Sequence, residues 1–190
     1  MRRLAAIAAA AILAGCRTSP YDHIENWVVR EDATRQFAIE ADVIYLQGTL
    51  YTNVTAVAGM ATYARSEVCK GRFSGLARVF SPLVANAEDL ENALDWYFGH
   101  RNSDRPFAFI GEGEGGALLK AYEESNSDYL REKGLVASFY TEVSNEGFVK
   151  DWMVREVRDA VSRRRYRMQW GREMPDGMLK RSDGQDNGGN

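Results

Sequence analysis

Apolar segments of two kinds alternate along this chain. Short continuous apolar runs flanked by polar or glycine residues are typical of strands buried on both faces. Longer segments with apolar residues three or four positions apart are typical of amphipathic helices. Ordered structure is expected to begin at Trp27-Val28-Val29. The predicted strands cover 43–46, 76–80, 107–110 and 135–140, and the apolar positions of the predicted helices fall within 54–68, 90–98, 117–130 and 148–161.

This alternation predicts an α/β fold, because strand-helix-strand units are right-handed and place helices on both faces of a parallel sheet. We expect a three-layer sandwich with a short, mainly parallel sheet of about four or five strands. The arginine-rich segment 163–167 is expected to close the last helix, with Gly171 as a stop signal. We assign residues 27–165 to the domain and the polar segment 166–190 to a disordered tail.

The amino terminus has the pattern of an export signal. Arg2 and Arg3 precede an apolar stretch, and small residues follow it at Ala14-Gly15. The stretch is too short to span a bilayer, which takes about 20 apolar residues. Leu-Ala-Gly followed by Cys16 resembles a bacterial lipobox, which implies a lipoprotein signal peptide over 1–15. An ordinary signal peptide with an incidental cysteine is the alternative.

The lipobox resemblance implies that Cys16 is the lipidated first residue of the mature chain, held in a membrane by its acyl chains. Residues 16–26 would then form a polar tether. The expected location is the bacterial cell envelope, facing the periplasm. The residue after the cysteine is Arg17 and not an aspartate. By resemblance to known lipoprotein sorting, in which an aspartate there favours the inner membrane, this favours the outer membrane.

Charge and cysteine content narrow the functional classes. The net charge of the whole chain is −3, and removing the leader with its two arginines makes it −5. A mildly acidic protein has no electrostatic case for binding nucleic acid. Once Cys16 carries lipid, Cys69 is the one thiol left, so no intramolecular disulfide is expected. We expect Cys69 to be a half-buried residue near a helix end.

The most informative internal motif is the glycine-rich turn 111–116, Gly-Glu-Gly-Glu-Gly-Gly, which follows one predicted strand and leads into a helix. This is the framework of a nucleophile elbow, G-x-S-x-G, whose serine stands on a tight bend with its hydroxyl exposed. Gly113 occupies the serine position and has no side chain. The degenerate elbow therefore consists of Gly111, Glu112, Gly113, Glu114 and Gly115.

A base for a nucleophile is also missing from the expected place. In hydrolases with this elbow, the acid and then the histidine follow the serine in chain order. The two histidines here, His23 in the tether and His100 at the end of a predicted helix, both precede the turn. We therefore expect no catalysis at this turn, and neither a cofactor nor a metal ion.

Two alternatives remain for the turn. We expect Glu112 and Glu114 to be structural, because carboxylates are stabilised at the positive end of a helix dipole. In the first alternative they act in altered chemistry, as an acid pair or as a Mg²⁺ or Ca²⁺ site built with Glu123 and Glu124.

The spacing of Gly111, Gly113 and Gly116 also matches the dinucleotide fingerprint G-x-G-x-x-G. Two observations oppose it: carboxylates in the loop would repel a pyrophosphate, and no acid occupies the expected place about 20 residues later. Glu132 comes before the next predicted strand, and Glu142 comes rather late.

Several segments together resemble an α/β-hydrolase-like bacterial family, domain of unknown function 3089. The similarity covers roughly residues 27–140 and rests on segments 42–49, 78–82, 93–98 and 102–111 in the same order. In that family an Arg-Pro-Phe strand leads into Gly-His-Ser-Gln-Gly; here Glu112, Gly113 and Glu114 replace its His, Ser and Gln.

The family's later strands, which carry the acid and the histidine, have no counterpart in this chain. The resemblance implies a truncated α/β-hydrolase-like fold without the activity. We therefore expect a lipid-anchored pseudoenzyme that binds a ligand or an envelope protein partner.

Overall fold

The computed structural model describes residues 19–31, 39–47, 56–101, 104–143, 148–175 and 177–179. In the helix over 56–73, side chains are described from residue 63 onward. The expected signal peptide 1–15 and the lipidation site Cys16 lie outside these residues, as does Arg17. Among the described residues, no helix combines the length and the apolar character needed to cross a membrane.

Within the described residues, five strands form one mixed sheet in the order β1-β3-β2-β4-β5. They are β1 (Trp27–Arg30), β2 (Ala41–Leu46), β3 (Ala77–Pro82), β4 (Phe107–Glu112) and β5 (Leu135–Thr141). The strands β3, β2, β4 and β5 run parallel, and β1 pairs antiparallel with β3. The mainly parallel sheet expected from the sequence is confirmed.

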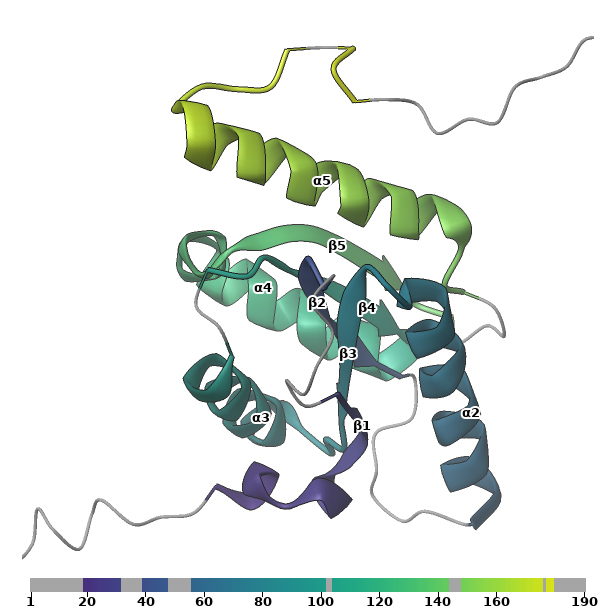
Figure 1. Ribbon diagram of the computed structural model, residues 1–190. Helices are drawn as coiled ribbons and strands as arrows, with labels where there is room; N and C mark the ends of the chain where they lie inside the picture. The colour runs from purple at the N-terminus through teal and green to yellow at the C-terminus, as the bar shows by residue number, and fades with distance from the viewer. Residues whose placement is uncertain are drawn as a thin grey trace, which may run out of the picture.

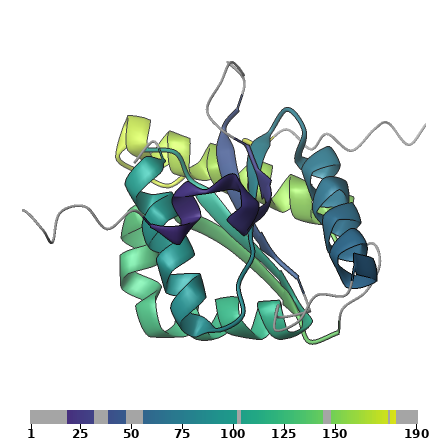
Figure 2. The same ribbon diagram turned by 90° about the horizontal axis from the view of Figure 1, so that it is seen from below.

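In the part of the chain that the structure describes, four long helices cover both faces of this sheet (Figures 1 and 2). They are α2 (Ala56–Phe73), α3 (Ala87–His100), α4 (Gly113–Lys133) and α5 (Asp151–Trp170). One core cluster joins side chains of α2 and α5 to the sheet, and the other joins side chains of α3 and α4 to it. The expected α/β architecture with helices on two faces is confirmed.

The central strands account for the continuous apolar runs. Every residue of β2, β3 and β4 is buried, because each strand has a neighbour on both sides and helices on both faces. The edge strand β1 alternates between buried and half-buried residues, and β5 is half-buried throughout. Helix α4 begins at Gly113 rather than at residue 117, because the glycine-rich turn is itself the first helical turn.

The segment 19–26 is not a free tether, which corrects the boundary expected at residue 26. Residues Pro20–Asp22 and Ile24–Asn26 form two short 3-10 helices against the domain. Tyr21 is buried, its hydroxyl donates to the carbonyl of Leu83 at 2.7 Å, and its own carbonyl accepts from the Trp27 indole at 2.9 Å. The burial of Tyr21 and its long-range hydrogen bond to Leu83 hold the segment on the sheet edge.

The last helix also extends past its assigned boundary. Helix α5 runs to Trp170 and ends at Gly171, whose φ of +62° is the left-handed conformation of a helix cap. Residues 166–170 therefore belong to the folded domain, which corrects the tail assigned from residue 166. The expected stop signal at Gly171 is confirmed, and residues 180–190 lie outside the described part.

A buried charge cluster stands at the amino-terminal edge of the sheet. Asp42 of β2 is fully buried, and its carboxylate accepts two hydrogen bonds from the Arg78 guanidinium, at 2.8 and 2.9 Å. The Tyr97 hydroxyl of α3 donates to the same carboxylate at 3.0 Å, and Arg105 lies 3.4 Å from it. This cluster ties β2 to β3, to α3 and to the start of β4.

Candidate functional site

The turn between β4 and α4 has the backbone of a sharp elbow. Glu112 is the last residue of β4 and Gly113 the first of α4, so no loop separates strand from helix. Gly113 has a φ of +55°, in the left-handed region that favours glycine. A nucleophile elbow requires a strained strand-to-helix bend of this kind.

Close backbone contacts explain the other glycines. A Cβ atom on Gly111 would lie 2.5 Å from the Cα of Gly116, and one on Gly115 would lie 2.2 Å from the carbonyl oxygen of Gln47. The first contact presses α4 against β4, and the second presses it against the end of β2. Larger residues would push the helix away from the sheet, so this G-x-G-x-G-G spacing is a packing requirement.

No imidazole reaches this bend, although both histidines of the chain lie in the described residues. His23 is exposed beside Glu25. His100, at the end of α3, stacks on Trp96 with 4.4 Å between ring centroids and lies 3.9 Å from Asp22. The adjacent Arg101 bonds backbone carbonyls that precede β4 and β5, which places this end of α3 at the amino-terminal edge of the sheet.

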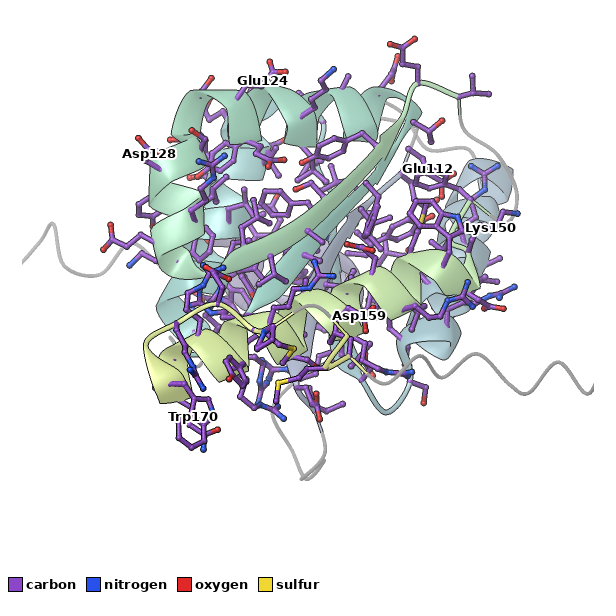
Figure 3. The ribbon with its side chains drawn as sticks, turned by 90° about the horizontal axis from the view of Figure 1, so that it is seen from above. Glu112, Glu124, Asp128, Lys150, Asp159 and Trp170 are labelled. Carbon is purple, nitrogen blue, oxygen red and sulfur yellow. The ribbon has the colours of Figure 1, made fainter. Side chains whose placement is uncertain are left out.

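Glu112 points into the core. The residue is 1% exposed, and its carboxylate accepts a hydrogen bond from the Tyr45 hydroxyl at 2.5 Å and lies 4.0 Å from Arg65 of α2. Burial and then the charge of Glu112 raise the pKa of Tyr45 above its ordinary value, so the phenol stays protonated and keeps donating. Figure 3 shows Glu112 beside α2, at the end of the sheet where α5 begins.

The acidic residues considered for a cation site are not brought together. Glu114 is exposed in the first turn of α4, and Glu123 accepts a hydrogen bond from Tyr140. Glu124 lies on the outer side of α4 (Figure 3), about 15 Å along the helix from Glu114. Within the described segments, no group of three or more histidine, cysteine or acidic side chains is placed to hold a metal ion.

Cys69 is more deeply placed than its sequence context indicated. The thiol is fully buried in the core between α2 and the sheet, where we expected half-burial. Burial, followed by the charges of Glu112 and Glu31, raises the pKa of the thiol. A protonated, inaccessible thiol is a poor nucleophile, so Cys69 does not replace the missing serine.

Sequence analysis missed a chain of buried polar side chains beside the bend. Gln47, directly after β2, donates to the Ser66 hydroxyl at 2.7 Å, and Ser66 donates to the Ser81 hydroxyl at 3.1 Å. All three are almost fully buried, and the carbonyl of Gln47 meets Gly115. Gln47 and Ser81 each follow an apolar run, which is too common a pattern to be diagnostic, and Ser66 lies inside α2, where the sequence gives no signal for it.

The dinucleotide interpretation stays a prediction, with one observation in its favour and one against it. Glu142 directly follows β5, the strand after the glycine-rich turn, which is where a ribose-binding acid would stand. Glu112 is turned away from any phosphate position, whereas Glu114 is exposed at the helix start, where it would repel a pyrophosphate.

Two cavities found in the structure lie away from residues 111–116. One, of about 510 Å³, is lined by α5 and by the segments before β2 and β4; the other, of about 210 Å³, lies between α3 and β3. A scan of protein-family models and searches of curated proteins and of solved structures return no match for this chain.

Proposed function

We propose that this chain is a lipid-anchored protein of the bacterial cell envelope, a catalytically inactive relative of the α/β-hydrolases that binds a ligand or another protein. The observation that supports this most is the bend at Gly113. It has an elbow's backbone but no attacking side chain, and both histidines lie elsewhere. A mechanism with a serine nucleophile lacks both its nucleophile and its base.

The strand order supports a retained binding location. The chain proceeds from β2 outward to β3 and from β4 outward to β5, so the strand order reverses between β2 and β4. Open α/β sheets bind ligands at the carboxyl ends of strands at such a reversal. The bend after β4 stands there, beside Gln47 at the end of β2.

The glycine also changes the energetics of the bend. A serine held at this backbone conformation costs about 1–3 kcal/mol in strain, which an enzyme tolerates for the sake of its nucleophile. Glycine adopts a positive φ without that cost. A protein that no longer needs the hydroxyl keeps the bend and loses the strain.

A fluorophosphonate probe for activated serines is expected not to label the full chain above the level of a heat-denatured sample. The Gly113→Ser variant should also stay unlabelled, because the restored hydroxyl has no imidazole to remove its proton. An active serine hydrolase mixed into the same sample provides the positive control. Labelling of the unmodified chain that disappears on denaturation would show an activated nucleophile and overturn the proposal.

The lipid anchor is tested at Cys16. Cells fed an alkyne analogue of palmitate should incorporate it into the protein, and Cys16→Ser should abolish the label and release the protein from the membrane fraction. Each buried CH₂ contributes about 0.8 kcal/mol to anchoring, so loss of several acyl chains removes the attachment. Cys69→Ala is the matched control and should keep the label. Membrane attachment that persists in the unlabelled Cys16→Ser protein contradicts the anchor.

A further inference from the structure

The larger cavity lies at the opposite edge of the sheet from the bend. Its walls come from the second half of α5 and from the residues that lead into β2 and β4. Figure 3 shows Trp170 at the far end of α5, away from Glu112. The volume of about 510 Å³ falls within the range of about 300–1,000 Å³ typical of small-molecule sites.

Three arginines line this cavity, and two of them already face carboxylates. Arg165 lies 3.4 Å from Glu40, and Arg105 lies 3.4 Å from the buried Asp42. Neither of these ion pairs includes Arg164. Asp104 also lines the cavity, so three arginines and two carboxylates line it, and the wall carries one more positive charge than negative.

Arg164 is held in place without a complete set of acceptors. Its Nε atom is buried and has no hydrogen-bond partner among the described residues. The guanidinium lies over Gly134, where an added Cβ would come within 3.1 Å of Nη2 and 3.3 Å of Cζ. Because Nε is closed to solvent, an anion in the cavity would be held by the terminal nitrogens of this guanidinium, whose positive charge forms no ion pair with the other described residues.

The uncharged lining residues are Gln169 and four apolar residues. Ile39, Pro106, Val161 and Met168 contribute carbon surface around the arginine. A planar carboxylate matches the two parallel N–H groups of a guanidinium, and burial of an attached apolar body adds hydrophobic stabilisation. A free inorganic anion would use the cation and leave the apolar wall in contact with water.

We propose that this cavity binds a small organic carboxylate with an apolar body, its carboxylate on Arg164 and its body against Val161, Pro106 and Met168. The site is separate from the bend after β4, so the proposal does not rest on the proposed function. Probe labelling at the bend and carboxylate binding here can each fail without affecting the other.

The test is calorimetric titration of the full chain with 4-phenylbutyrate, with its uncharged amide and with inorganic phosphate. We expect saturable binding of the carboxylate, at least about tenfold weaker binding of the amide and of phosphate, and at least about tenfold weaker carboxylate binding by Arg164→Gln. A tenfold change corresponds to about 1.4 kcal/mol. Arg163→Gln is the matched control, because Arg163 is the exposed neighbour outside the cavity, and its Kd should be unchanged.

A thermal melt of each variant verifies folding, and Arg164→Gln should melt at or above the temperature of the unmodified chain because it removes a buried donor without a partner. Equal carboxylate affinity in a folded Arg164→Gln variant would overturn the proposal. So would an absence of saturable binding by the unmodified chain. Phosphate binding as tight as carboxylate binding would assign the cavity to inorganic anions and overturn it as well.

Discussion

Replacing Asp42 with alanine should lower the free energy of unfolding by about 3–5 kcal/mol, measured by urea denaturation at neutral pH. The carboxylate is fully buried and accepts both hydrogen bonds of the Arg78 guanidinium, whose side chain is only 10% exposed. Without it, the buried Arg78 loses its hydrogen-bonded counter-charge and keeps only the charge interaction with Glu31, and the Tyr97 hydroxyl loses its acceptor. Domains of this kind have about 5–15 kcal/mol of stability in total, so the loss is severe.

Two controls separate burial from charge pairing as such. Asp151→Ala breaks an ion pair with Arg72 whose partners are 75% and 42% exposed, and its cost should stay below about 1 kcal/mol. The double variant Asp42→Leu with Arg78→Met removes both buried charges and should be more stable than Asp42→Ala. A cost below 1 kcal/mol for Asp42→Ala would contradict the role assigned to this cluster.

Gly115→Ala should destabilise the fold by about 3 kcal/mol, although alanine is the better helix former. The added Cβ would stand 2.2 Å from the carbonyl oxygen of Gln47 and within 3.0 Å of two further backbone atoms of that residue. Backbone cannot rotate away as a flexible side chain does, so α4 must shift from the end of β2. Thermal or urea unfolding of the variant measures the cost.

Gly71→Ala is the matched control for this substitution. Gly71 is also helical, in α2, and a Cβ there would meet nothing within 4 Å. The change should stabilise the protein by about 0.5–1 kcal/mol, because glycine loses more backbone freedom on folding than alanine. If Gly115→Ala were neutral or stabilising like Gly71→Ala, the close approach of α4 to β2 would be refuted.

The interior strands were predictable because burial on both faces produces a continuous apolar run in the sequence. A parallel strand covered on both faces needs apolar residues at every position, and β2 and β4 have them over 43–46 and 107–110. The antiparallel edge strand β1 has four residues and only alternate burial. Its pairing with β3 depends on long-range contacts, which a local pattern does not contain.

The candidate site was predictable in its backbone and not in its side chains. The glycine spacing at 111–116 indicated a tight strand-to-helix bend, because only glycine fits close contacts and a positive φ. The direction of Glu112 depends on which face of β4 it occupies, and its partners Tyr45 and Arg65 come from distant segments. Asp42 and Arg78 likewise become neighbours only through the register of β2 and β3.

The sheet's connectivity has a kinetic consequence. The central strand β2 finds both of its neighbours later in the chain, and no two described strands form a hairpin. Chain closure over long separations must therefore precede any stable strand pair, and such topologies fold slowly. A newly made polypeptide of this kind is therefore expected to stay unfolded for longer than one whose contacts are mostly local.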